Sequence, residues 1–281
     1  MLAFLNGRFL PVEQATVSVL DRGFILGDGL FETMRAVRGR LLFWPDHLAR
    51  LRSGAEALGI PLEAGGEDLG GVATELLGQN GLSDAVVRIQ VSRGPGVRGY
   101  SPRGAGPATR VVTVHPPASP AAAERGWRLR TWSGRVQGSD AFARHKTGSK
   151  LRQILARAEA EAAGADEALL LTQEGHLCEA AAANLFWIRE RAVFTPSLEA
   201  GCLAGVTRSV LLRTLRQEGW QCDEVLAPAS ALGEADGVLL TLASLGVVEV
   251  VELDGNAISR SGLLHDIRGA YQRACDRHLS D

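Results

Sequence analysis

Two lysines stand out among the basic side chains of this sequence. The 281 residues include 30 lysines and arginines, and only Lys146 and Lys150 are lysine. Arginine stays charged at any working pH, whereas a lysine amine can lose its proton and attack a carbonyl carbon. One interpretation is an amine that forms a Schiff base with a carbonyl, on a substrate or on pyridoxal phosphate. The other is codon bias that left two lysines together by chance.

Composition narrows the class of protein. The net charge is −2 with both signs interspersed, so nothing indicates nucleic acid or an anionic membrane as a partner. The opening residues carry no basic leader region, and no apolar run is long enough to span a bilayer. The four cysteines and six histidines show no metal-ligand spacing and no CxxC pair. We therefore expect a reduced, cytoplasmic protein without a metal.

The first part of the chain reads as strands followed by helices. Helical spacing of leucines after Asp46 predicts a helix that ends at Gly59, and a second helix is expected at 69–79. A turn at Arg38-Gly39 is expected to join two strands. Alternating or apolar runs predict strands at 2–5, 16–20, 31–37, 41–43, 86–91 and 110–114.

The Pro-dense segment 116–120 reads as a stiff connector, which places a domain boundary between a domain of residues 1–118 and one of residues 119–281. Beyond it, Ser149 is expected to cap a helix that runs to Ala163, and further helices are expected at 206–217 and 263–278. Strands are expected at 127–132, 168–172, 185–188, 238–242 and 247–253. The expected inner face of the first of these helices is Leu151, Ile154, Leu155, Ala158 and Ala162. Without regular βαβ alternation, the pattern predicts an α+β fold in two parts.

A pyridoxal phosphate site needs a phosphate cradle and a partner for the pyridine nitrogen as well as a lysine. Thr207 lies in a helix start after Gly205, which suits a phosphate or is a plain helix N-terminus. Arg50 suits phosphate equally, or is a surface arginine. Glu179, before a run of small residues, is a candidate partner for the ring or an exposed carboxylate. The Gly-rich loop 93–100 could clamp a carboxylate or be only a mobile loop.

The order of several short motifs along the chain resembles that of the class IV (fold type IV) pyridoxal-phosphate enzymes. The resemblance extends from Asn6-Gly7 to about Gly255. The motifs that carry it are Asp21-Arg22-Gly23-Phe24, Gly27-Asp28-Gly29-Leu30-Phe31-Glu32-Thr33, His47 with Arg50-Leu51, Ser92-Arg93-Gly94, Arg98-Gly99-Tyr100, Lys146 with Lys150-Leu151, Gly164-Ala165-Asp166-Glu167-Ala168, Glu179 with Asn184-Leu185-Phe186-Trp187, Thr195-Pro196 and Gly205-Val206-Thr207-Arg208.

This resemblance assigns roles to single residues. It matches Lys146, not Lys150, to the Schiff-base lysine, and Glu179 to the partner of the pyridine nitrogen. It implies that Arg50 and the amides of Val206 and Thr207 hold the phosphate of pyridoxal 5'-phosphate. It also implies a small N-terminal α/β domain and a larger mixed-sheet domain like those of D-amino-acid aminotransferase, with the cofactor between them, in a homodimer whose partner subunit helps close the site. Further positions implied at the cofactor are Asn184 and Ala243.

The same resemblance separates the reactions of the family less sharply. Arg98-Gly99-Tyr100-Ser101 looks most like 4-amino-4-deoxychorismate lyase, which eliminates pyruvate to give p-aminobenzoate in folate synthesis. A D-amino-acid aminotransferase would typically carry histidine at Tyr100. Departures from the lyase pattern are Leu242 and Glu249, where asparagine and proline are usual. The alternative is a class IV aminotransferase that acts on branched-chain L-amino acids or D-amino acids with 2-oxoglutarate. Substrate-binding positions implied for the amine and carboxylate are Phe31, Thr33, Arg98 and Tyr100.

Overall fold

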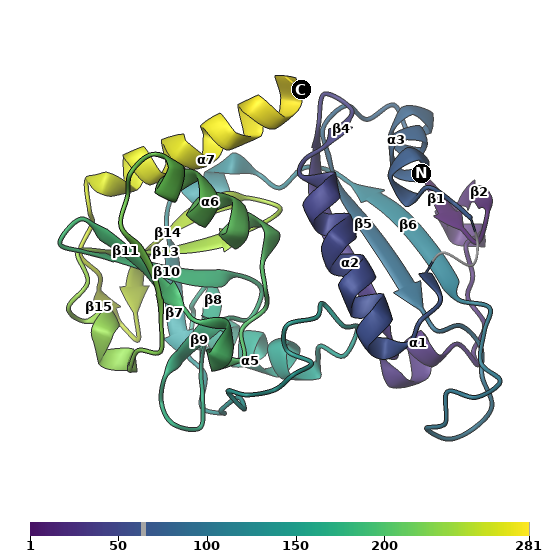
Figure 1. The fold of residues 1–281 in the computed structure, drawn as a ribbon, viewed down its shortest axis with the longest axis horizontal. Helices are drawn as coiled ribbons and strands as arrows, with labels where there is room; N and C mark the ends of the chain where they lie inside the picture. Colours follow the sequence, from purple (N-terminus) through teal and green to yellow (C-terminus); the bar gives the residue numbers. More distant parts are fainter. Residues whose placement is uncertain (63–65, 281) are drawn as a thin grey trace. The chain divides into compact units, whose positions relative to one another are not determined.

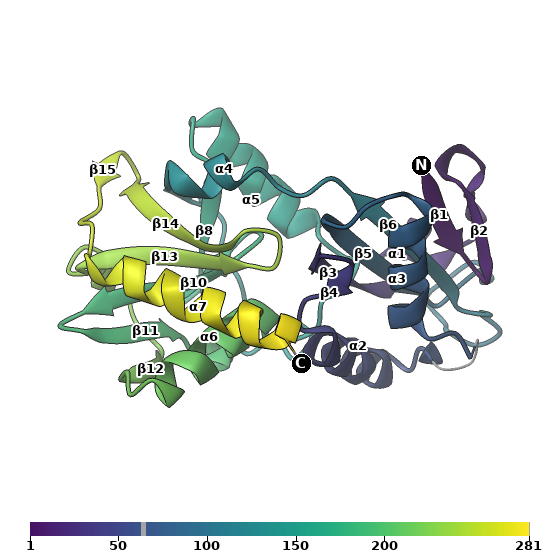
Figure 2. The same ribbon diagram turned by 90° about the horizontal axis from the view of Figure 1, so that it is seen from above.

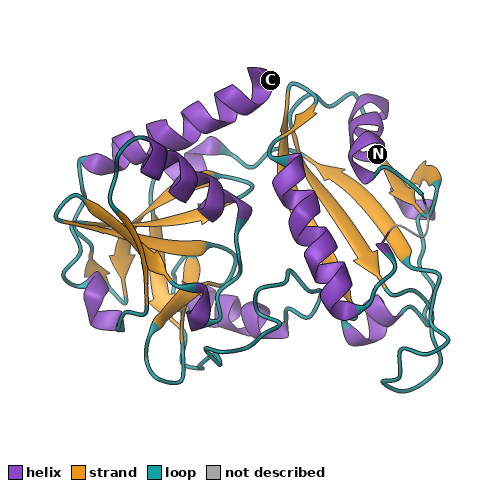
Figure 3. Ribbon diagram, in the orientation of Figure 1, coloured by secondary structure: helices purple, strands orange, loops and turns teal. Residues whose placement is uncertain are grey.

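The computed structural model describes residues 1–62 and 66–280, and the chain divides into two compact units. The first unit comprises Met1–Ala118 together with His145–Lys150, and the second comprises Ser119–Arg144 and Leu151–Asp281. Each unit mixes helices with a sheet (Figure 3), so the expected α+β class is confirmed.

The first unit is built on an antiparallel sheet in the order β2-β1-β6-β5-β3-β4 (Figure 1). The hairpin between β3 and β4 turns at Arg38 and Gly39, which have φ of 52° and 76°. Two positive φ values match the twist of the flanking strands, as in type I′ turns. The strands are β1 (Leu2–Leu5), β2 (Arg8–Pro11), β3 (Gly29–Val37), β4 (Arg40–Leu41), β5 (Ala85–Ser92) and β6 (Thr109–His115).

Two helices, α2 (Trp44–Leu58) and α3 (Leu69–Gln79), pack against this sheet and form its core. Alternate residues of β5, including Val87 and Ile89, are fully buried beneath them, as the period of two in a strand requires. A short α1 (Arg22–Leu26) and the 3-10 turn η1 (Val12–Gln14) complete the unit. The prediction of a strand at 16–20 is wrong. This exposed segment pairs with no strand and ends in the turn that begins α1.

The second unit is built on a mixed sheet in the order β12-β11-β10-β13-β14-β7-β8-β9, with β15 beside β14. Three of its pairs are parallel, namely β11 with β12, β14 with β7, and β7 with β8. The described strands are β7 (Trp127–Thr131), β8 (Glu167–Leu171), β9 (Leu177–Ala180), β10 (Asn184–Arg189), β11 (Ala192–Pro196), β12 (Cys222–Val225), β13 (Gly237–Leu242), β14 (Gly246–Leu253) and β15 (Asn256–Ala257).

Helices α6 (Val206–Gln217) and α7 (Leu263–Ser280) contact each other and lie on this sheet, as Figure 2 shows from above. The unit also contains α4 (Pro120–Glu124), α5 (Leu151–Ala162) and the 3-10 turns η3 (Leu198–Ala200) and η4 (Ala229–Leu232). No helix among the described residues is long and apolar enough to cross a membrane.

The inner face expected for α5 is wrong. Ala156 and Ala160 are its buried residues, whereas the side chains of Leu151, Ile154 and Leu155 are exposed. The two alanines pack with Ala168 and Leu170 of β8. Small side chains allow the helix to approach the strand closely, so alanine and not leucine forms the contact.

Candidate active site

Lys146 is fixed on β3 of the first unit. The amide of Phe31 donates a hydrogen bond to the carbonyl of Lys146 (2.9 Å), and the amide of Gly148 donates to the carbonyl of Gly29 (2.8 Å). These bonds make a short antiparallel bridge between Leu30 and Thr147. The Lys146 Nζ atom then lies 4.5 Å from the centroid of the Phe31 ring. The backbone of β3 therefore positions the lysine, and the ring of Phe31 contacts its amine.

The sheet face that carries Phe31 also carries Thr33, two residues along β3, because alternate residues share a face. Thr33 pairs with Arg88 of β5, and the Arg88 Cζ atom lies 4.0 Å from the centroid of Phe31. Cations this close to an aromatic ring are attracted by its quadrupole. Of the expected substrate contacts, Phe31 thus contacts the Lys146 amine, and Thr33 follows Phe31 on the same face of β3.

Glu32 points to the opposite, buried face of β3, where it meets two residues of α2. Its carboxylate accepts hydrogen bonds from Arg50 Nε (2.8 Å) and Arg50 Nη2 (2.6 Å), and it lies 2.7 Å from His47 Nδ1. Glu32 and His47 are each about 1% exposed. Arg50, the expected phosphate ligand, is therefore held in a fixed orientation by a bidentate ion pair.

The charge states of this cluster follow from its surroundings. Burial alone would raise the pKa of Glu32, but hydrogen bonds and charge from Arg50 and His47 outweigh it and lower the pKa to about 2. Burial lowers the pKa of His47, and the nearby charges of Arg50 and Lys146 act in the same direction, against the opposing effect of Glu32. Near pH 7 the glutamate is ionised and the histidine is neutral, so His47 Nδ1–H donates to Glu32.

Acid should destabilise the first unit through these two groups. Below the ordinary histidine pKa of 6.5, His47 of the unfolded chain binds a proton that the folded protein excludes. The free energy of unfolding therefore decreases as the pH is lowered. Between pH 4.5 and about 2, Glu32 adds a loss on the order of 3 kcal/mol. Urea denaturation measured at a series of pH values below 6.5 gives the free energy of unfolding. This free energy should depend less on pH in His47→Gln than in the natural protein. Equal slopes for both proteins would contradict this account.

Arg98 and Tyr100 lie in the long segment between β5 and β6, residues 93–108, within the first unit. Both are exposed, and the Tyr100 side chain is 87% exposed. Loops longer than about 12 residues without secondary structure are commonly functional. The expected carboxylate contacts are thus presented on an irregular loop.

In the second unit, Glu179 of β9 and Asn184 of β10 hold the same residue. The amide of Leu203 donates to Glu179 Oε2 (2.9 Å), and Asn184 Nδ2 donates to the carbonyl of Leu203 (2.9 Å). Both hydrogen-bonding groups of one peptide residue are therefore fixed by side chains. The segment before α6 is positioned by Glu179 and Asn184.

Helix α6 begins directly after this segment, with Gly205 as N-cap and no side-chain cap hydrogen bond. A Cβ atom on Gly205 would lie 1.9 Å from Asn184 Oδ1, so any larger residue there would displace the Asn184 side chain. Val206 and Thr207, the first residues of the helix, are buried. The first amides of a helix lack intrahelical acceptors, and together with the Thr207 hydroxyl they suit an anion such as phosphate.

Thr241 of β13 lies directly opposite Asn184 of β10, so both side chains share one face of the sheet. Its Oγ1 atom is buried and has no hydrogen-bond partner among the described residues. Ala243, an expected cofactor contact, follows in the turn after β13. A buried hydroxyl without a partner is costly, so this neighbourhood is suited to a polar ligand.

The two departures from the lyase pattern, Leu242 and Glu249, have different surroundings. Glu249 is 4% exposed, and its carboxylate accepts two hydrogen bonds from Arg260, at 2.9 and 2.5 Å. Glu249 therefore has a structural role as half of an ion pair. Leu242 pairs with Gly246 at the end of the hairpin between β13 and β14.

Sequence reasoning did not assign a role to Glu32 or Arg22. Leu30, Glu32 and Met34 alternate along β3 and share its buried face, so Glu32 is a charge at a core position. A charge at such a position requires a buried partner, and this signal could have pointed to Glu32. Arg22 is also only 4% exposed, but its short helix offers no comparable periodicity.

Comparisons with known proteins show the family and the fold of this chain. Residues 29–253 match the family model described as amino-transferase class IV. A candidate branched-chain-amino-acid aminotransferase of Methanocaldococcus jannaschii is 34% identical over 92% of this chain and 90% of its own. An aminodeoxychorismate lyase of Vibrio harveyi is also 34% identical, over 88% of this chain and 89% of its own. The branched-chain aminotransferase of Thermoproteus uzoniensis superposes with a TM-score of 0.91 at 28% identity and covers 100% of this chain and 97% of its own.

Proposed function

Because this chain belongs to the class IV aminotransferase family, we propose that it is a 4-amino-4-deoxychorismate lyase that eliminates pyruvate to give p-aminobenzoate. Enzymes of class IV depend on pyridoxal phosphate, and this chain is such an enzyme. The observation that carries the assignment of its reactive amine is the anchoring of Lys146 on β3.

The residues present fit the cofactor. The uncapped start of α6, the buried Thr207 hydroxyl and the buried Thr241 hydroxyl without a described partner supply polar groups for a phosphate ester and ring substituents. In the proposed site, Arg50, Val206 and Thr207 would bind the phosphate, and Glu179 would pair with the pyridine nitrogen. Asn184 and Ala243 would complete the cofactor contacts, and Lys146 would provide the covalent attachment.

When bound, pyridoxal phosphate supplies a conjugated ring that accepts the electrons of a broken bond. Lys146 Nζ would act as the base that takes the proton from the substrate carbon that bears the amino group. The negative charge of Glu179 would favour a proton on the pyridine nitrogen. Arg98 and Tyr100 bind and orient the substrate carboxylate, and Phe31 and Thr33 contact the substrate near Lys146.

The lyase proposal is supported by the Arg98-Gly99-Tyr100-Ser101 loop and by the Vibrio harveyi relative. The same Lys146 amine would also serve a transaminase, as the base that takes the substrate proton. A branched-chain aminotransferase is the second candidate, favoured by an equally similar relative and by the fold of the Thermoproteus uzoniensis enzyme. For this candidate, 2-oxoglutarate is the expected amino acceptor.

The test is p-aminobenzoate formation by the purified protein supplied with enzymatically generated 4-amino-4-deoxychorismate. We expect formation that is abolished in Lys146→Ala. The parallel arm incubates the same protein with branched-chain L-amino acids or D-amino acids and 2-oxoglutarate. Glutamate formation without p-aminobenzoate, from a yellow and folded protein, would replace the lyase by the aminotransferase.

We also propose that the enzyme is a homodimer. Helix α1 of the first unit exposes several apolar side chains, with Phe24 72% and Ile25 47% exposed. Burial of such side chains against a second copy would remove apolar surface from water. This feature supports association of two copies.

A further inference from the structure

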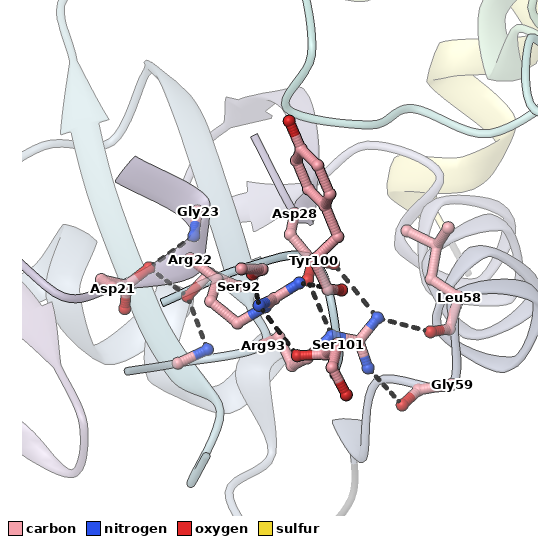
Figure 4. Close-up of polar contacts among 12 residues, drawn as sticks. Asp21, Arg22, Gly23, Asp28, Leu58, Gly59, Ser92, Arg93, Tyr100 and Ser101 are labelled. Carbon is pink, nitrogen blue, oxygen red and sulfur yellow. Dashed lines mark hydrogen bonds and ion pairs between the residues drawn. The ribbon is translucent and has the colours of Figure 1, made fainter. Parts of the chain in front are cut away.

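Arg22, at the start of α1, holds three consecutive carbonyls of the loop that carries Tyr100. Its Nη1 atom donates to the carbonyls of Gly99 and Ser101, and its Nη2 atom donates to the carbonyl of Tyr100, each at 3.1 Å. Figure 4 shows the guanidinium facing this backbone while the tyrosine ring points away from it. The contact therefore fixes the backbone of the loop and leaves the Tyr100 side chain exposed.

The charge of Arg22 is balanced by Asp28. Arg22 Nε donates to Asp28 Oδ2 at 2.8 Å, and Arg93 Nε donates to the same oxygen at 2.8 Å (Figure 4). Burial would raise the pKa of Asp28, but hydrogen bonds from Arg93 and Arg22 outweigh it and lower that pKa. Asp28 is thus ionised near neutral pH, and Arg22 can remain almost fully buried at 4% exposure.

The two arginines that share Asp28 hold different segments. Arg22 reaches the loop, whereas Arg93 donates to the carbonyls of Leu58 (2.7 Å) and Gly59 (2.9 Å), at the end of α2. This division provides a matched pair for experiment. Each arginine has the same carboxylate partner, but only Arg22 contacts residues 99–101.

Backbone contacts brace Arg22 from both sides. Its own amide donates to the carbonyl of Gly94 (3.0 Å), and the amide of Gly96 donates to the carbonyl of Leu20 (3.1 Å). A Cβ atom on Gly96 would lie only 2.9 Å from Arg22 Cδ. The Arg22 side chain therefore passes closely over Gly96 on its way to the loop.

We propose that Arg22 is a positioning residue for substrate recognition, fixing the loop that presents Arg98 and Tyr100 to a substrate carboxylate. The inference rests on the proposed function, in which those two residues bind the carboxylate. A planar guanidinium with several donors can gather three carbonyls, whereas a lysine ammonium cannot match that geometry. A loop ordered in advance loses less entropy when the substrate binds.

The experiment compares Arg22→Lys with Arg93→Lys in the cofactor-loaded protein. Hydrogen exchange should become faster in the peptide covering 97–105 of Arg22→Lys, and near residues 58–60 of Arg93→Lys. KM for the substrate that the natural enzyme turns over should rise on the order of 10-fold to 100-fold in Arg22→Lys, with kcat nearly unchanged. Arg93→Lys should retain the natural KM.

A second variant covers the case in which Arg22→Lys does not fold. Gly96→Ala keeps both arginines but pushes a methyl group against Arg22 Cδ, and it should give the same loop exchange and the same rise in KM. Natural loop exchange and natural KM in either folded variant would overturn the positioning role. If the natural enzyme turns over neither 4-amino-4-deoxychorismate nor an amino acid, the proposed function fails. The hydrogen-exchange result still decides whether Arg22 orders the loop.

Discussion

Replacement of Lys146 by alanine is expected to lower kcat on the order of 10⁴-fold or more. The variant loses both the covalent attachment of the cofactor and the amine that removes the substrate proton. The fold should survive, because the backbone hydrogen bonds between the Lys146 segment and β3 remain in the variant. Turnover under saturating substrate and pyridoxal phosphate, with the far-UV circular dichroism of both proteins, measures the effect.

Lys150→Ala is the matched control, since it removes the only other lysine of the chain. It should retain most of the turnover and the visible colour of the bound cofactor. Borohydride reduction followed by peptide mass spectrometry should place the cofactor on Lys146 in both the natural protein and Lys150→Ala. A label on Lys150, or the loss of turnover in Lys150→Ala alone, would mean that the two lysines have been assigned the wrong way round.

Local sequence signals predicted the helices best. Residues 69–79 and 206–217 form α3 and α6 with the expected bounds. Asp68 accepts a hydrogen bond from the amide of Gly70 and marks the first of these starts, and Gly205 marks the second. These signals lie within a few residues of the helix itself, so they can be read without the tertiary structure.

Strands and the buried faces of helices were harder to predict, because they depend on the elements against which they pair or pack. The apolar segment 16–20 has strand-like residues but no neighbouring strand to pair with. The short strands β9 and β12 were not anticipated, since pairing rather than pattern defines them. In α5 the leucines predicted an inner face, but the contact with β8 selected alanines. The local periodicity of apolar residues does not show which of them will pack against a distant element.

The site shows the same division. The scarcity of lysine drew attention to Lys146 from composition alone, but nothing local indicated that its segment pairs with β3, more than a hundred residues earlier. The ion pair between Glu32 and Arg50 also joins residues that are 18 positions apart and lie on different elements. Motif order gave the identity of candidate residues, and only the fold gave their supporting contacts.

Glu179 combines two requirements that a substitution can separate. Its Oε2 atom accepts a hydrogen bond from the amide of Leu203, which positions the segment before α6. Its negative charge is what the proposed chemistry needs at the pyridine nitrogen. A glutamine at this position keeps an acceptor oxygen and nearly the same shape, but it carries no charge.

Glu179→Gln is therefore expected to lower kcat on the order of 100-fold to 1,000-fold, while cofactor affinity and KM change little. The segment before α6 should stay in place because the amide oxygen still accepts from Leu203. Glu179→Ala loses the acceptor as well, so it should also weaken pyridoxal phosphate binding. Cofactor titration followed by visible absorbance separates the two variants.

Glu249→Gln provides the control for removing a buried carboxylate from the same unit. Its ion pair with Arg260 is structural, so this variant should unfold at a lower urea concentration but keep its kcat. If Glu179→Gln behaves like Glu249→Gln, with lost stability and natural turnover, then Glu179 holds only the loop, and another group must act at the pyridine nitrogen. A fall in kcat without a fall in stability assigns the charge of Glu179 to the chemistry.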